Sequence, residues 1–259
     1  MKQLSKDKPF SLVLSGGGAL GMAHLGVLHD LAQKSLKPAE IIGTSMGGII
    51  GACLAIGMPE TQIHEKLKSF ASVTKWIKFS ISGNSIVDSA RIEKIFDAIF
   101  GERMMSDIEI PLKIIATNLE TGDKRVFAAG DRVLIKDAVL ATMAIPGIFE
   151  EKVIAGSVYG DGFLCENLGL RESSYSTILA VDVVGRNAFS KALPDNFFKT
   201  FNVIEMLERS IRLLMYNQTK NILEQVDKNI LLLEPDTSEF KTFHFYKVKE
   251  IRALGLGLL

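Results

Sequence analysis

Residues 41–48, Ile-Ile-Gly-Thr-Ser-Met-Gly-Gly, join a short apolar stretch to an uncharged run of helix length. The pattern GxSxG within this segment is typical of a serine on a sharp turn from a strand into a helix, where glycine neighbours allow the backbone to bend tightly. The segment therefore predicts a buried strand over 39–42 followed by a helix. Ser45 is the candidate nucleophile, and Gly43 and Gly47 are the glycines of its turn.

A second glycine-rich segment follows the apolar stretch Phe10–Leu14, which predicts another buried strand. Gly16, Gly17, Gly18 and Gly21 form the pattern GxGxxG at the start of a predicted helix. The backbone amides of such a loop bind an anion at the helix N-terminus. That anion is either the pyrophosphate of a dinucleotide or the oxyanion of a tetrahedral intermediate.

The acidic residues near this loop favour the oxyanion. A dinucleotide site also needs a carboxylate about 20 residues further on, at the end of the second strand, to hold the ribose. Glu40 precedes that strand, and Gly-Thr-Ser-Met-Gly-Gly follows it. We therefore expect Gly17 and Gly18 to be amide donors that face Ser45. Phosphate or nucleotide binding without catalysis is the alternative function for this loop.

The rest of the chain alternates apolar strand patterns with helical ones. We expect helices over 19–31, 60–70, 89–100, 133–142 and 203–226, strands over 112–117, 125–128, 177–184 and 230–233, and a hairpin over 153–159. This alternation predicts an α/β fold with a mostly parallel sheet covered on both faces, in which sites lie at the carboxyl ends of strands. No repeat or low-complexity linker divides the chain, so a single domain over 1–259 is expected.

Composition excludes several classes of function. The 259 residues are 47% hydrophobic, which is enough for one large core. Lys and Arg total 30, as do Asp and Glu, so no basic surface is indicated and nucleic acid is not an expected partner. Cys53 and Cys165 stand far apart without paired histidines, which predicts neither a zinc site nor a disulfide. We expect no metal and no cofactor, and the oligomeric state has no signature here.

Two stretches bear on the location of the protein. The apolar residues Phe10–Leu14 follow several lysines but are shorter than the core of a secretory signal, which spans ~7–15 residues. The run Ile41–Met58 has no charge, and membrane-spanning helices need ~17–25 such residues, but its glycines fit poorly with a helix facing lipid. We therefore expect a cytoplasmic protein without a membrane-spanning helix.

A serine nucleophile needs a general base, conventionally a histidine oriented by a carboxylate. His24 and His64 do not fit the order Ser, Asp, His of α/β-hydrolases, and structural roles are expected for them. His244 is the only late histidine and leaves a triad open as an alternative. Asp161, between two glycines after a predicted strand, is presented on a bare turn, for which an Asx-turn is the simpler interpretation.

Four motifs together resemble the patatin-like phospholipases. In chain order they are LSGGGALGMAHLGVL at 14–28, GTSMGG at 43–48, ATMAIPGIF at 141–149 and DGF at 161–163. The resemblance covers roughly 10–184, and residues 198–259 are expected to complete the domain with helix and strand.

The resemblance implies a three-layer α/β/α sandwich in which a Ser–Asp dyad replaces the triad. It makes Ser45 the nucleophile, Asp161 the base and the loop from Gly16 to Gly21 the anion cradle. The implied activity is that of a serine hydrolase acting on lipid acyl esters, of phospholipase A or lysophospholipase type. We expect a short Ser45–Asp161 hydrogen bond, acylation of the serine, and then attack by water on the acyl-enzyme.

Two departures from the family pattern affect the expected substrate range. Phe163 stands where the family usually has Gly or Ala, and with Met46 it is a candidate for lining the acyl channel. The chain continues to Asn167-Leu168-Gly169, without the proline that usually follows two places after the asparagine. A patatin-fold regulatory protein with little hydrolysis is therefore a further alternative.

The segment Phe70–Ile81 combines large apolar side chains with two lysines, a composition suited to a membrane interface or a lid. Peripheral contact with a membrane through this segment is a prediction. Trp76 is the only tryptophan of the chain, so its fluorescence should shift to the blue when phospholipid vesicles are added. Emission that is unchanged over a vesicle titration would remove this assignment.

Overall fold

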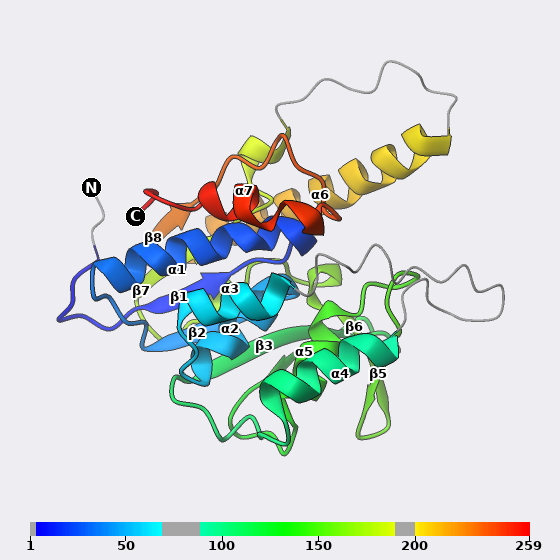
Figure 1. Ribbon diagram of the computed structural model, residues 1–259, viewed down its shortest axis with the longest axis horizontal. Helices are drawn as coiled ribbons and strands as arrows, with labels where there is room; N and C mark the ends of the chain where they lie inside the picture. Colours follow the sequence, from blue (N-terminus) through cyan, green and yellow to red (C-terminus); the bar gives the residue numbers. More distant parts are fainter. Residues whose placement is uncertain (1–3, 69–88, 190–199) are drawn as a thin grey trace.

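The computed structural model describes residues 4–68, 89–189 and 200–259, which form one mixed sheet with helices packed on it (Figure 1). The strand order is β5-β6-β3-β2-β1-β7-β8, and β4 also pairs with β3. The parallel strands are β1 Ser11–Leu14, β2 Glu40–Thr44, β3 Leu112–Asn118, β7 Thr177–Val181 and β8 Asn229–Leu233. The antiparallel strands are β4 Lys124–Phe127, β5 Lys152–Ile154 and β6 Ser157–Asp161.

Both faces of the central strands are buried, which explains why they are apolar throughout rather than alternating. Successive side chains of a strand point to opposite faces. In β1, Leu12 and Leu14 belong to the larger core cluster and Val13 to the smaller one. Ile41 and Ile42 of β2 divide in the same way. Two cores separated by the sheet make a three-layer arrangement.

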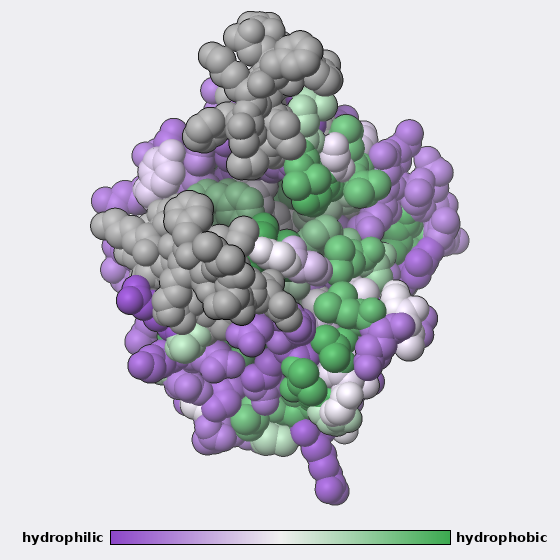
Figure 2. All heavy atoms as spheres, turned by 90° about the vertical axis from the view of Figure 1, so that its right-hand side faces the viewer, coloured by the Kyte–Doolittle hydropathy of each residue, from purple (hydrophilic) through white to green (hydrophobic). Residues whose placement is uncertain are grey.

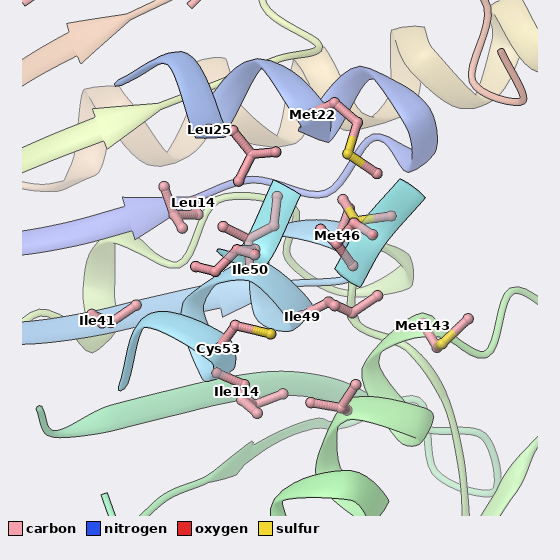
Figure 3. Close-up of a cluster of buried hydrophobic side chains, with 14 of the residues drawn as sticks. Leu14, Met22, Leu25, Ile41, Met46, Ile49, Ile50, Cys53, Ile114 and Met143 are labelled. Carbon is pink, nitrogen blue, oxygen red and sulfur yellow. The ribbon is translucent and has the colours of Figure 1, made fainter. Parts of the chain in front are cut away.

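Helices cover each face of this sheet. The larger core contains side chains from α1 Ala23–Gln33, α2 Met46–Ala55, α3 Glu60–Leu67, α4 Ser89–Phe100, α5 Ile135–Met143 and α7 Val248–Ala253. Figure 3 shows part of it, with Leu14 and Ile41 of the strands beside Leu25 and Ile50 of the helices. The smaller core receives Ile222 from the end of α6, which spans Thr200–Gln225. The expected α/β fold with a mostly parallel sheet between helices is confirmed.

Most predicted elements are present, with shifted ends. The predicted helix over 89–100 coincides with α4, whereas the helix expected over 19–31 starts as a 3-10 turn, η1 Gly18–Met22, before α1. The predicted strand over 177–184 ends early, at Val181. Helix α7 was not indicated by the apolar pattern, because only six residues form it.

The uncharged run Ile41–Met58 is divided between β2 and α2, which meet at Ser45. No helix in the described parts of the chain combines the length and the hydropathy needed to cross a bilayer.

Gly47 allows α2 to lie directly against the end of β1. A Cβ atom at Gly47 would be 2.3 Å from the carbonyl oxygen of Leu14, and one at Gly43 would be 2.5 Å from the carbonyl oxygen of Gly47. Both neighbours are backbone atoms, so no side chain can move aside to relieve the overlap. The two glycines of the GxSxG pattern are therefore required by the close approach of β1, β2 and α2.

Gly47→Ala should destabilise the fold, because overpacking typically costs about 1–3 kcal/mol and here the contact is with backbone. Thermal unfolding is expected to show a melting temperature several degrees below that of the wild type. Gly130→Ala is the matched control, since nothing lies within 4 Å of its added Cβ. Equal melting temperatures for the two variants would contradict the packing argument.

Candidate functional site

Ser45 occupies the sharp turn between β2 and α2. Its backbone has φ 52° and ψ −123°, in the left-handed half of the map that residues other than glycine rarely adopt. The residue is almost completely buried, at 5% exposure, and its N–H donates to Oγ1 of Thr142 at 2.8 Å. The local structure is thus the strained strand-to-helix turn that the GxSxG pattern predicts.

Asp161 lies at the end of β6, which pairs with β3, itself the neighbour of β2. This pairing brings the carboxyl group to Ser45 across 116 positions of sequence, and the Ser45 hydroxyl donates to Oδ2 of Asp161 at 2.6 Å. The other carboxyl oxygen, Oδ1, accepts the N–H of Phe163 at 3.0 Å. The short Ser45–Asp161 hydrogen bond expected from the sequence is present.

Burial changes the acidity of this carboxyl group. Asp161 is fully buried, and the loss of solvation raises its pKa from 3.8 to about 7, although the Phe163 N–H and the Ser45 hydroxyl both oppose the rise. An aspartate at its ordinary pKa of about 3.9 would be a feeble base at neutral pH. A pKa close to neutrality suits proton exchange with a substrate at neutral pH.

The glycine loop lies directly against Ser45, since a Cβ on Gly16 would be 3.0 Å from the Cβ of Ser45. The Gly16 N–H donates to Oδ1 of Asn167 at 3.1 Å, and the Ala19 N–H donates to the carbonyl oxygen of Thr242 at 2.7 Å. Both of these amides therefore already have an acceptor within the protein.

Gly17 and Gly18 differ from these neighbours. Their φ angles are 152° and 57°, and neither N–H has an acceptor within the residues that the structure describes. Gly21 serves packing, because a Cβ there would be 2.4 Å from Cγ of Met46. Of the four loop glycines named from the sequence, Gly17 and Gly18 have amides free to bind an anion, and Gly16 does not.

No described histidine is bonded to Ser45, whose hydroxyl pairs with Asp161. His24 is fully buried against the carbonyl oxygen of Ser15, and burial lowers its pKa to about 4. His244 accepts the N–H of Lys241 on Nδ1, at 3.1 Å. The arrangement gives no support to a triad based on His244.

Glu40 does not serve a ribose either. It lies at the start of β2, at the opposite end of the sheet from the glycine loop, where it accepts hydrogen bonds from Ser11 and Lys113. The nucleotide interpretation of the loop therefore lacks its acidic partner.

Three polar residues that support the site had no recognisable signal in the sequence. Thr142 holds the Ser45 backbone. Asn167, which the sequence placed only as the asparagine before the missing proline, holds Gly16. Gln218 of α6 accepts the N–H of Asn167 and donates to the carbonyl oxygen of Phe163, at 3.1 and 3.0 Å. Their roles depend on contacts between distant segments, which spacing does not reveal.

The acyl-channel residues proposed from the sequence lie near the site. Met46 is buried against Gly21, and Phe163 is partly buried in the 3-10 turn η3 Gly162–Leu164. A cavity of about 380 Å³ lies between α4, α5 and β5, but neither residue lines it. Its lining mixes apolar and charged side chains from α4, α5, the segment before β5 and β5 itself: Ile92, Glu93, Leu140, Met143, Phe149, Glu150, Glu151, Lys152 and Val153.

The site lies at the carboxyl ends of β1 and β2. Figure 2 shows this side of the molecule, where hydrophobic residues gather in a band. Leu164, three residues after Asp161, is exposed, as is Leu119 directly after β3. The segment Phe70–Ile81, with Trp76, lies outside the described residues. In the parts that are described, no group of three or more His, Cys, Asp or Glu side chains could hold a metal ion.

A sequence model of the patatin-like phospholipases matches residues 12–173, more than half of the chain. The chain belongs to this family. An NTE family protein of Mycobacterium tuberculosis, named uncharacterized, is 32% identical over 168 residues, which cover 63% of this patatin-like chain and 45% of the relative.

Other relatives align along nearly the whole chain. Lysophospholipase NTE1 of Debaryomyces hansenii is 24% identical over 284 residues, covering 99% of this chain and 18% of the relative. Lysophospholipase NTE1 of Candida glabrata is 25% identical over 279 residues, covering 98% and 16%. The chain therefore spans less than half the length of these relatives.

Among solved structures, VipD from Legionella pneumophila is similar with a TM-score of 0.56 and 15% sequence identity. The match covers 96% of this chain and 64% of VipD, and it supports the patatin-like fold.

The raised pKa of Asp161 predicts a difference in stability between the wild type and Asp161→Asn. Between about pH 4 and pH 7 the native carboxyl keeps a proton that the unfolded chain releases, so wild-type stability falls as the pH rises through this window. The variant has no such proton, so its stability relative to the wild type should rise progressively as the pH increases through this window. Denaturant unfolding at several pH values measures the difference.

Asp182, a second buried carboxyl whose pKa burial raises to about 6, titrates in both proteins and cancels from the comparison. A difference in unfolding free energy that stays constant across the window would show that Asp161 does not titrate in this way.

Proposed function

We propose that this patatin-like chain hydrolyses carboxylic esters of lipids, with Ser45 as nucleophile and Asp161 as general base. One observation carries the proposal: the Ser45 hydroxyl donates to a buried carboxylate at 2.6 Å, beside a loop whose Gly17 and Gly18 amides are uncommitted. Family membership independently supports a lipid hydrolase.

The first half of the reaction acylates the enzyme. Asp161 takes the proton of the Ser45 hydroxyl as the oxygen attacks the ester carbonyl carbon. The carbonyl oxygen becomes an oxyanion, which the Gly17 and Gly18 amides stabilise. When the intermediate collapses, the bond to the alcohol oxygen breaks, and the proton held by Asp161 passes to the departing alcohol.

The second half restores the serine. Asp161 accepts a proton from a water molecule, whose oxygen attacks the acyl carbon. The new oxyanion occupies the same loop, the bond to Ser45 breaks, and the serine oxygen recovers its proton. A fatty acid leaves. The buried setting supports both halves, because a carboxyl group with a pKa of about 7 gains and releases a proton at little cost near neutral pH.

Lysophospholipids are the substrate class that we propose. Two relatives named lysophospholipase align along nearly the whole of this chain. Release of a fatty acid from a lysophospholipid, compared with release from a diacyl phospholipid, a glyceride and a short-chain ester, tests this assignment. The exposed Leu119 and Leu164 suit a substrate that carries a hydrocarbon chain.

A fluorophosphonate probe tests the nucleophile and the base together. The wild type should be labelled on Ser45, with a rate that rises as the pH increases through about 7, because the base must be deprotonated. Ser45→Ala should not be labelled, and Asp161→Asn should be labelled at least about 10²-fold more slowly. Peptide mapping by mass spectrometry locates the adduct.

His244→Ala is the control for the alternative triad and should label at the wild-type rate. An adduct on another residue, or a wild-type rate in Asp161→Asn, would remove the Ser–Asp assignment. Labelling without turnover on any of the four esters would instead favour a regulatory protein of the patatin fold, the alternative that Phe163 suggests.

A further inference from the structure

Two residues at the end of α5 contact the catalytic pair proposed above: Thr142 contacts the Ser45 backbone and Ala144, the C-cap, contacts the Asp161 backbone. Thr142 is fully buried, and its Oγ1 accepts the Ser45 N–H at 2.8 Å. Two residues later, the carbonyl oxygen of Ala144 accepts the Asp161 N–H at 2.8 Å. The nucleophile and the base are thus attached to one short segment, although they lie on different strands.

The second hydrogen-bond partner of Thr142 determines the direction in which its hydroxyl proton points. Oγ1 also donates to the carbonyl oxygen of Ile115, in the middle of β3. A hydroxyl has one proton, so the proton given to Ile115 leaves a lone pair directed at the Ser45 N–H. The hydroxyl thus joins the Ser45 backbone to β3, the strand that lies between β2 and β6.

The methyl group of Thr142 has a separate role. A Cβ on Gly48 would be 3.0 Å from Cγ2 of Thr142, so the methyl packs against α2. Valine keeps the methyl and loses the hydroxyl, whereas serine keeps the hydroxyl and loses the methyl. These two replacements therefore separate packing from hydrogen bonding.

We propose that the Thr142 hydroxyl is a positioning group for ester hydrolysis, which holds the strained Ser45 backbone so that its Oγ meets both Asp161 and the substrate carbonyl. The assignment rests on the proposed function. It also removes one amide from the set of oxyanion donors, because the Ser45 N–H is bonded to Thr142.

The test compares Thr142→Val with Thr142→Ser on a soluble short-chain ester. Misplacing a reacting group by about 1 Å can cost about 10²-fold, so Thr142→Val should lower kcat by about that factor. KM should stay within about threefold, because the hydroxyl touches the serine backbone rather than the substrate. Thr142→Ser should retain kcat within a few fold. The fluorophosphonate labelling rate of Ser45 should follow kcat in both variants.

Ser173→Ala is the matched control. Ser173 is also buried and donates its hydroxyl to a backbone carbonyl, that of Tyr175, but it contacts Ser11 at the amino end of β1. Its removal should lower the melting temperature and leave kcat unchanged. This comparison distinguishes loss of a buried hydrogen bond in general from loss of the one at Ser45.

Wild-type kcat in folded Thr142→Val would overturn the proposal. Equal losses of kcat in the valine and serine variants would also overturn it, because the effect would then come from the changed shape of the side chain and not from the hydroxyl. Should the valine variant fail to fold, Thr142→Cys replaces it, since a thiol is a weak hydrogen-bonding group of similar size to serine. The same loss of kcat is expected, and wild-type kcat in Thr142→Cys would overturn the assignment.

Ser45→Ala separates this inference from the proposed function. If Ser45→Ala loses activity while Thr142→Val keeps it, the positioning role alone is wrong. If Ser45→Ala keeps activity, the dyad and the positioning role are both wrong.

Discussion

The hydrogen bond between the almost completely buried Ser45 hydroxyl and the fully buried Asp161 carboxyl group is the interaction on which the rest of the site depends. A carboxylate loses solvation when it is buried, and here one oxygen receives a single hydroxyl and the other a single backbone N–H. This sparse set of donors leaves the pKa high. The same burial that disfavours the charged form gives the group a proton affinity suited to neutral pH.

Close backbone packing makes that enclosure possible. Gly43 and Gly47 let β1, β2 and α2 approach more closely than any side chain would permit, and Gly16 brings the neighbouring loop against Ser45. The glycines of the two motifs therefore have different purposes. Gly43, Gly47 and Gly16 lack side chains, which lets neighbouring segments come into contact. Gly17 and Gly18 have positive φ angles, which favour glycine, and their amides have no acceptor among the described residues.

The sequence is most informative where a local pattern determines the structure. Two apolar strands followed by glycine-rich turns predict parallel strands whose ends lie together, and Ser45 lies on the strained turn that its motif requires. The supporting residues were not predictable in this way. Thr142, Asn167 and Gln218 act through hydrogen bonds to segments far away in the chain, and a threonine at the end of an apolar helix carries no mark of such a partner. The raised pKa of Asp161 depends equally on complete burial, which no local pattern reports.

The family model matches the chain only up to residue 173, but the contacts that shape the glycine loop extend beyond that residue. The carbonyl oxygen of Thr242 accepts the Ala19 N–H. The Gln218 side chain accepts the N–H of Asn167 and donates to the carbonyl oxygen of Phe163. The carboxyl-terminal third of the chain is thus a scaffold for groups that lie near the amino terminus. Residues 12–173 alone therefore lack contacts that hold the glycine loop in place. A design that grafts this site into another protein must include α6 and the segment around Thr242.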